Sequence, residues 1–318
     1  MPPIGGRWAI VLAGGDGTRV HGLTFDEQGW PAPKQYSRIA GQRSLLSAAI
    51  ARAERLAPRQ HIVVVVAGGH ERWWRSIKAS HPDLHLVIQS LNRGTAPAIL
   101  DAILHIQKHD PNPHVAILPA DHAVEDETAL AATFRFAFHL TARDRHSIMM
   151  LGIEPDRAEP GYGWVEPLFP SNDGPSPVAY FVEKPPAALA VELMARGALW
   201  NAFLLVGAGR CFLDLYRIAQ SDLLHDFMSA QGDAAEILRL YRRLPVLDFS
   251  RDVLARIPGR LRVLRVPPCG WTDLGTPERL ARWSVAHAAK PCSPGIAPPA
   301  PRQSSVPDHE LTEMLAVS

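Results

Sequence analysis

Short, nearly continuous apolar runs alternate along the chain with segments in which apolar residues recur every three or four positions. Such a run is typical of a strand buried on both faces, and the longer period is typical of a helix with one buried face. The predicted strands cover Trp8–Ala13, Ile62–Ala67, Leu84–Ile88, His114–Leu118 and Ser147–Ile153, and the predicted helices cover Arg43–Leu56, Glu71–Ala79, Ala98–Lys108 and Thr128–Ala142. This alternation predicts an α/β fold with a parallel sheet.

The pattern changes in the second half of the chain. Two short β segments, at Pro160–Pro167 and Val178–Val182, are separated by a turn-rich loop, which indicates a smaller substrate-binding part laid against the main sheet. Helices are expected across 210–244 and Pro277–Ala289, with a last strand at Leu261–Val266. The expected fold class is α/β, with a Rossmann-like mixed, mainly parallel sheet flanked by helices and a small β-containing subdomain.

Composition narrows the class of protein. Hydrophobic residues make up 47% and charged residues 20% of the chain, as in ordinary globular proteins. Lys and Arg (33) balance Asp and Glu (32), so no overall field would attract nucleic acid or an anionic membrane. No apolar run is long enough for a membrane span and no secretory signal precedes the first strand, so we expect a cytoplasmic protein. Residues 290–318 are rich in proline and serine, which predicts a disordered tail.

Cysteine and histidine give no metal motif. Cys211, Cys269 and Cys292 lie far apart and form no C-x-x-C pair, so neither a disulfide framework nor a cysteine zinc site is predicted. His105 and His109 are spaced to share one face of a helix and could together bind a metal ion. No third ligand stands near them in the sequence, so we expect surface histidines instead.

A glycine-rich loop follows the first strand. Gly14, Gly15 and Gly17 lie within four residues and precede Thr18 and Arg19, and Lys34 follows fifteen residues later. Such glycines bring several backbone N–H groups to one point, which suits phosphate oxygens, and the cations would add full positive charge. The spacing fits neither G-x-x-x-x-G-K-[ST] nor G-x-G-x-x-G, which disfavours a dinucleotide site. The alternative is a turn that binds nothing.

Two further polar positions follow predicted strands. Thr95 is expected to cap the helix that begins near Ala98, so that the helix N-terminus faces the loop at 89–94. Asp121 follows the strand that ends at Leu118, where a carboxylate is well placed to bind Mg²⁺, although a turn cap would use the same residue type. Ligands bind at this edge of doubly wound sheets.

Motifs in a fixed order extend this picture. They are Gly14–Arg19, Pro33–Tyr36, Arg93–Ile99, Pro119–His122, Gly161–Trp164, Phe181–Pro185, Trp200–Asn201 and Trp271–Thr276. With this set the chain resembles the nucleotide-sugar pyrophosphorylases, most closely the mannose-1-phosphate guanylyltransferases, over about residues 7–285. The resemblance implies a catalytic domain at 1–289, with a nucleotide-binding part at about 7–153 and a sugar-binding part at about 154–276.

The resemblance also implies an activity. The family transfers a nucleotidyl group: a sugar 1-phosphate attacks the α-phosphate of a nucleoside triphosphate and pyrophosphate leaves. The expected substrates are GTP and mannose 1-phosphate, which yield GDP-mannose for polysaccharide biosynthesis, with Mg²⁺ as cofactor and a possible homodimer. Neither nucleic acid nor a membrane is an expected partner.

Roles follow by motif, and each is what the resemblance implies. Triphosphate contacts are expected from the glycine loop, with charge neutralisation by Arg19 at the pyrophosphate and Lys34 at the α-phosphate. The resemblance further implies that the nucleotide is bound by Gln89, Gly94 and Thr95, and Mg²⁺ by Asp121 and Asp273. It implies that sugar hydroxyls are bound by Gly163, Glu183 and Asn201, and the sugar phosphate by Lys184. For Glu183 and Lys184 the alternative is an ion pair at a strand end, and for Asn201 it is a cap.

Other functions stay open beside this one. At Gly94 the guanylyltransferases usually have Asn, and Ala202–Phe203 replace a small residue followed by Gly, so another base and sugar (glucose 1-phosphate with UTP or dTTP) would suit the same mechanism. A non-catalytic nucleotide-sugar-binding relative is a further alternative. A metal-dependent glycosyltransferase is disfavoured because no D-x-D motif occurs in the chain.

Overall fold

The computed structural model describes residues 5–20, 22–26, 28–39, 43–170 and 174–287. Its centre is a nine-stranded mixed sheet in the order β3-β2-β1-β4-β8-β5-β9-β7-β6. The strands are β1 Arg7–Ala13, β2 Ile62–Ala67, β3 His85–Gln89, β4 His114–Pro119, β5 Ile148–Ile153, β6 Gly163–Pro167, β7 Ser176–Glu183, β8 Leu199–Ala208 and β9 Leu261–Arg265. The α-helices are α1 Leu45–Glu54, α2 Glu71–Ser80, α3 Thr95–His109, α4 Glu127–Arg143, α5 Ala187–Ala195, α6 Gly209–Ala219, α7 Ser221–Ala230, α8 Ala234–Arg243, α9 Phe249–Asp252 and α10 Pro277–His287.

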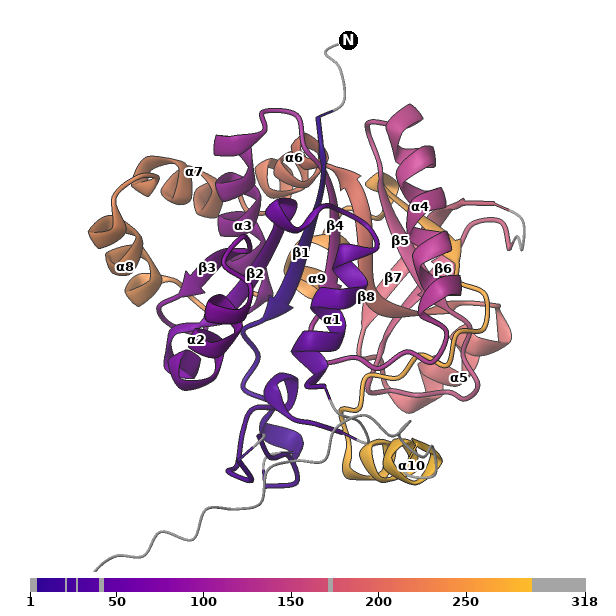
Figure 1. Ribbon diagram of the computed structural model, residues 1–318. Helices are drawn as coiled ribbons and strands as arrows, with labels where there is room; N and C mark the ends of the chain where they lie inside the picture. Colours follow the sequence, from indigo (N-terminus) through magenta and orange to yellow (C-terminus); the bar gives the residue numbers. More distant parts are fainter. Residues whose placement is uncertain (1–4, 21, 27, 40–42, 171–173, 288–318) are drawn as a thin grey trace, which may run out of the picture.

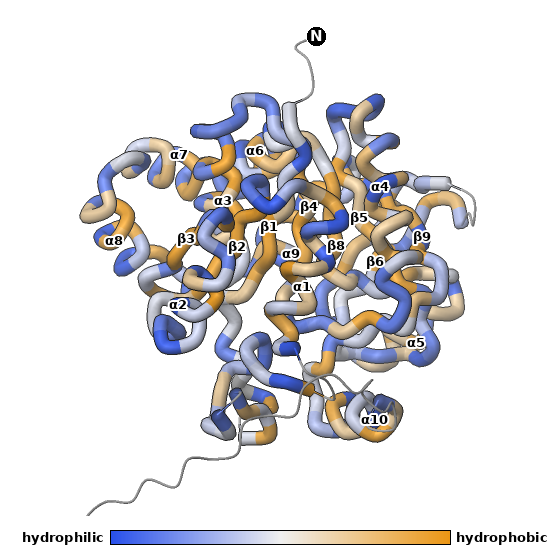
Figure 2. Tube along the Cα trace, viewed as in Figure 1, coloured by the Kyte–Doolittle hydropathy of each residue, from blue (hydrophilic) through white to orange (hydrophobic). Residues whose placement is uncertain are grey.

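The first four strands form a parallel block, as the apolar runs predict. Side chains on successive residues of β1 point to opposite faces of the sheet. Ile10 packs in one cluster with residues of α3, α6 and α7, whereas Val11 packs in another with residues of α1 and α4. The sheet is therefore covered by helices on both sides, and the most apolar stretches of the chain run through its middle (Figure 2).

The second half of the sheet is mixed. β8 runs antiparallel between β4 and β5, and its central residues Leu205 and Val206 are fully buried. Neither this strand nor α5 was expected from the sequence, because the apolar residues 199–208 precede helices without a turn signal. β6 pairs with β8 and β7 pairs with β9, so the two β segments of the predicted subdomain extend the main sheet and do not form a separate one.

Loops gather at the carboxyl ends of the parallel strands. The segment after β1 and helix α10 lie below the arrowhead of β1, next to the start of α1 (Figure 1). Ala123 and Thr272 exchange backbone hydrogen bonds, which joins the loop after β4 to the segment before α10. Residues from distant parts of the chain are thereby brought to one edge of the sheet.

Several predictions concern features other than the sheet. Within the described ranges, no helix has the length and apolar character that crossing a membrane requires. Cys211 and Cys269 are free and buried, in line with the absence of a predicted disulfide framework. Cys292 and the predicted tail at 290–318 lie outside the described residues. The cytoplasmic location and the homodimer stay predictions.

Candidate active site

A cavity of about 390 Å³ opens at the carboxyl ends of β1, β2 and β4. The loop after β1, the loop between β3 and α3, and the end of β4 contribute most of its wall. Its lining includes Gly14, Gly15, Gly17, Gln89, Gly94, Thr95 and Asp121 from the predicted site, together with Gln35, Asn92, His122, Phe203, Val246 and Asp248. Residues predicted from separate motifs thus face one space.

The glycine loop is held by a neighbouring side chain. The Gln35 amide donates through Nε2 to the carbonyl oxygens of Ala13 and Gly15, both at 2.8 Å. Gly17 has a φ of +61°, a left-handed conformation that favours glycine. The side chain of Thr18 lies outside the described part of the chain, and its backbone belongs to the short 3₁₀ turn η1 (Thr18–Val20).

The loop between β3 and α3 forms the opposite wall. Asn92 Nδ2 donates to Asp16 Oδ2 at 2.9 Å, which bridges this loop to the glycine loop. Gln89 Nε2 donates to the carbonyl oxygen of Gly94 at 3.3 Å. Gly94 has a φ of +84°, and a Cβ there would overlap the carbonyl oxygen of Leu247. This position therefore requires glycine in this chain.

Thr95 differs from its prediction. It is the first residue of α3, and Gly94 occupies the N-cap position, so the expectation that Thr95 caps the helix is wrong. The Thr95 hydroxyl instead accepts a hydrogen bond from the backbone N–H of Phe249 at 2.7 Å. The reason is tertiary: the segment at 247–249 packs against the helix start, where the Phe249 N–H donates to Thr95 and the Leu247 carbonyl accepts from the N–H of Ala96.

Lys34 is the central cation of the site. Its side chain is only 5% exposed, and Nζ lies 2.8 Å from Asp121 Oδ2 and also donates to the carbonyl oxygen of Asp273. Burial acts to raise the pKa of Asp121, but the Lys34 ammonium outweighs it and holds that pKa below its usual value. Lys34 therefore contacts Asp121 through its carboxylate and Asp273 through its backbone carbonyl oxygen.

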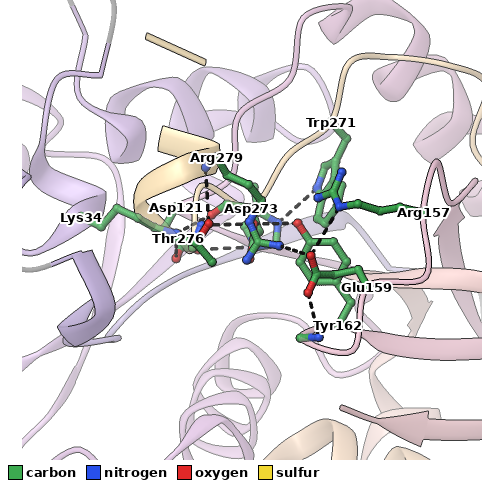
Figure 3. A network of polar contacts seen from close by, with 12 residues as sticks. Lys34, Asp121, Arg157, Glu159, Tyr162, Trp271, Asp273, Thr276 and Arg279 are labelled. Atoms are coloured by element: carbon green, nitrogen blue, oxygen red, sulfur yellow. Dashed lines mark hydrogen bonds and ion pairs between the residues drawn. The ribbon is translucent and has the colours of Figure 1, made fainter. Parts of the chain in front are cut away.

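A polar network anchors Asp273 from the other side (Figure 3). Its Oδ1 atom accepts hydrogen bonds from Tyr162 Oη at 2.8 Å and from the backbone N–H of Gly275 at 3.1 Å, and lies 3.0 Å from Arg279 Nε. Arg279 is held in turn by Glu159 Oε2 at 3.2 Å. Burial and then the Asp273 charge raise the pKa of Tyr162, so the phenol stays a hydrogen-bond donor.

His122 follows Asp121 and lines the cavity. Burial lowers its pKa to about 4, so the imidazole is neutral at neutral pH. Trp271 Nε1 donates to His122 Nδ1 at 3.2 Å, which places the ring proton on Nε2, on the side of Asp121 Oδ1 3.8 Å away. His122 belongs to the P-A-D-H motif, but the sequence analysis assigned it no chemical role.

The predicted sugar ligands form a row across three strands. Glu183 of β7, Gly163 of β6 and Asn201 of β8 are direct register partners. A Cβ at Gly163 would overlap Glu183 Oε2, so glycine leaves room for that carboxylate. Burial raises the pKa of Glu183, although Lys184 opposes this. Asn201 Oδ1 accepts from the N–H of Phe203 at 3.0 Å, so its role in the fold is within a strand and not as a helix cap.

Two predicted cations lie on the surface. Lys184 Nζ is 3.4 Å from Glu183 Oε1, and its side chain is 58% exposed. Its backbone has a φ of +50°, a conformation uncommon for a lysine. Arg19 is exposed on η1 and is not among the described residues that line the cavity. The structure thus shows the ion pair that the sequence allowed for Lys184, and leaves the role of Arg19 a prediction.

Residues that the sequence reasoning did not select complete the site. Phe203, Val246 and Asp248 line the cavity, and Tyr162 and Arg279 hold Asp273. No sequence motif indicates that residues 244–248 belong to the site. This segment is joined to the cavity wall by backbone hydrogen bonds between Leu247 and residues 93 and 96.

Comparisons with known proteins agree with this geometry. A family model described as nucleotidyl transferase matches residues 8–290. The xanthan biosynthesis protein XanB of Xanthomonas campestris pv. campestris (strain B100) is 30% identical over 276 residues, which cover 84% of this chain and 57% of that protein. A mannose-1-phosphate guanylyltransferase of Escherichia coli (strain K12) is 28% identical over 308 residues, which cover 89% of this chain and 60% of that protein.

A solved structure is similar as well. It is described as mannose-1-phosphate geranyltransferase from Thermus thermophilus, has a TM-score of 0.75 and 25% sequence identity, and the match covers 85% of this chain and 76% of that chain. The chain spans about three fifths of the length of the two curated relatives. Because the family model matches residues 8–290, which is most of the chain, we conclude that the chain belongs to the nucleotidyl transferase family.

Proposed function

We propose that the protein transfers the guanylyl group of GTP to mannose 1-phosphate, forming GDP-mannose and pyrophosphate. The observation that carries this proposal is the ion pair between the buried Lys34 and Asp121, beside a cavity whose wall includes the glycine loop. Curated relatives at 28–30% identity, among them a mannose-1-phosphate guanylyltransferase, support the choice of substrates.

The reaction needs charge neutralisation more than bond-making groups. A phosphate oxygen of the sugar phosphate attacks the α-phosphorus of the triphosphate, the bond to the bridging oxygen breaks, and pyrophosphate leaves with its electrons. Two polyanions must approach each other, and unit charges ~4 Å apart interact by about 4 kcal/mol at an effective dielectric constant of about 20. Lys34 would neutralise charge at the α-phosphate, and the loop N–H groups would orient the triphosphate.

We further propose that Asp121 and Asp273 hold a magnesium ion. The Asp121 side chain is 37% exposed and faces the cavity. Asp273 Oδ1 accepts two hydrogen bonds and forms an ion pair with Arg279, which would leave Oδ2 as the ligand atom. One or two carboxylates plus phosphate oxygens is the donor set that Mg²⁺ prefers. A bound Mg²⁺ would supply positive charge to the triphosphate and to the leaving pyrophosphate.

The sugar phosphate would bind along the row on β6, β7 and β8. Glu183 and Asn201 would accept and donate hydrogen bonds to sugar hydroxyls, and Gly163 leaves the space in which they meet. The exposed Lys184 would contact the sugar phosphate, exchanging its ion pair with Glu183 for one with the ligand. Arg19 would contact the pyrophosphate end from η1.

The test is pyrophosphate release with Mg²⁺, crossing GTP, dTTP, UTP, CTP and ATP with mannose 1-phosphate and glucose 1-phosphate. Release confined to GTP with mannose 1-phosphate is the expected result, and chelation of the metal with EDTA should abolish it. Release with another pair would keep the mechanism and replace the substrates. No release with any pair, while nucleotide still binds, would favour a non-catalytic nucleotide-sugar-binding protein.

A further inference from the structure

Three histidines lie together at the end of the sheet remote from the cavity. His85 begins β3, and His105 and His109 lie on the last turns of α3. The ring centroids are 5.1 Å apart for His85 and His105, 4.8 Å for His85 and His109, and 5.1 Å for His105 and His109. One ring nitrogen of each residue lies within 4.8 Å of the others, so the three imidazoles are close enough to share one ion.

The spacing suits a tetrahedral ion. Ligand atoms at the Zn–N distance of about 2.0–2.1 Å stand about 3.3 Å apart in a tetrahedron. His85 Nδ1 and His105 Nε2 are already 3.0 Å apart. His109 is exposed, so its side chain can rotate to complete the set.

The ring protons are arranged for binding. His85 Nε2 lies 3.1 Å from the carbonyl oxygen of Gln60, which can only accept, so His85 carries its proton on Nε2 and keeps the lone pair on Nδ1. A backbone carbonyl behind a ligating histidine is the usual support for a metal site. The His105 proton, now between the two rings, would move to Nδ1 when its Nε2 binds a metal.

The charge of the cluster selects the kind of metal. The three-residue set contains no carboxylate. Hard cations such as Mg²⁺ and Ca²⁺ need oxygen ligands and negative charge, whereas neutral imidazoles suit Zn²⁺.

We propose that His85, His105 and His109 bind one Zn²⁺ ion, with water as the fourth ligand. The ion would join the start of β3 to the end of α3, two elements that are neighbours in Figure 1. Gln89 at the other end of β3 and Thr95 at the other end of α3 line the cavity. α3 has fifteen residues and spans about 22 Å, so the ion would act as a distant brace for that wall and would not take part in the reaction.

Zn²⁺ titration of the full chain, freed of any histidine tag, tests the proposal. Calorimetry should show one strong site, thermal unfolding should shift to higher temperature, and Co²⁺ in place of Zn²⁺ should give the intense visible bands of four-coordinate cobalt. His109→Ala removes an exposed ligand and should weaken binding about a hundredfold. His105→Ala should do the same, with circular dichroism to check its fold.

A matched control keeps the result specific. His139 is an exposed histidine on α4, far along the chain from the three ligands, so His139→Ala should bind Zn²⁺ like the parent protein. Absence of a strong site in the parent protein would overturn the proposal. Full stoichiometric binding by His109→Ala would overturn it too, because the ion would then be held elsewhere.

Discussion

The nucleotide end and the sugar end of the candidate site are built by different means. At the nucleotide end the chain supplies mainly backbone: a glycine loop, a glycine with positive φ and one helix start frame the cavity. At the sugar end it supplies a row of side chains on three hydrogen-bonded strands. Backbone walls tolerate few residue types, whereas a side-chain row depends on which strands pair. Mutations at the nucleotide end and at the sugar end should therefore have different effects on kcat and KM.

The largest effect is expected from Lys34→Ala. This buried ammonium is paired with Asp121, and we propose that it neutralises charge at the α-phosphate. Its loss should lower kcat by a factor on the order of 10²–10³, measured as pyrophosphate release at saturating substrate. Lys184→Ala is the matched control at the sugar end, where the lysine is exposed, and should mainly raise KM for the sugar phosphate. Equal losses of kcat would contradict the division of roles.

Gly94→Ala should come second. A Cβ there would overlap the Leu247 carbonyl oxygen, and the backbone conformation (φ 84°, ψ −174°) adds strain of about 1–3 kcal/mol. We expect lower stability together with a raised KM for the nucleotide, because the wall between β3 and α3 must shift. Gly232→Ala separates the causes: its φ is +96° and a Cβ meets nothing within 4 Å, so only the strain should appear in thermal unfolding. If the two variants bind the nucleotide with equal affinity, Gly94 does not contribute to the nucleotide site.

A smaller effect is expected from Asn201→Asp. The new carboxylate still accepts from the N–H of Phe203, and the Ser250 hydroxyl, which now accepts from Nδ2 at 3.1 Å, can donate to it instead. The variant has no donor left for the sugar, so one hydrogen bond to the sugar is lost. KM for the sugar phosphate should rise roughly tenfold, in line with about 1.4 kcal/mol for a lost hydrogen bond, with KM for the nucleotide unchanged. A parallel rise in both KM values would mean that the two ends are not independent.

The smallest effect should come from Glu183→Gln. Because burial raises the folded-state pKa of Glu183, the neutral form favours the folded state at low pH, and that stability is lost as pH rises through the raised pKa. At pH 7–8 the variant removes the buried charge and should unfold about 1–3 °C higher than the parent protein. Below pH 4, where Glu183 is protonated in both states, the difference should vanish. A constant difference at all pH values would assign the effect to packing.

The sequence predicted the parts of the fold that local patterns specify. The parallel strands from β1 to β5 were predicted within a residue or two of their bounds, because each is a continuous apolar run followed by a turn. The same logic placed Gly14 and Asp121 at one edge of the sheet, and in the structure both line the cavity, where Lys34 contacts Asp121. Their roles toward substrates, like the Mg²⁺ ion, stay proposals.

What the sequence did not reveal depends on tertiary pairing. β8 is apolar like a buried helix and was not recognised, yet it places Asn201 beside Gly163. Thr95 was expected to cap α3, but a segment about 150 residues later supplies its partner. The third histidine of the remote cluster, His85, is twenty residues from His105 and joins it only because β3 and α3 pack together.

Gln35 has a consequence for how a nucleotide would enter. Its amide uses Nε2 to hold the carbonyl oxygens of Ala13 and Gly15, so these two partial negative charges are turned toward the amide before any phosphate arrives. The loop is in this sense preorganised: little conformational freedom is left to lose on association, and few repulsive dipoles must be rotated away. Nucleotide capture should therefore proceed as docking onto a ready-made surface, at a rate set by diffusion and orientation, without a slow closing step of this loop.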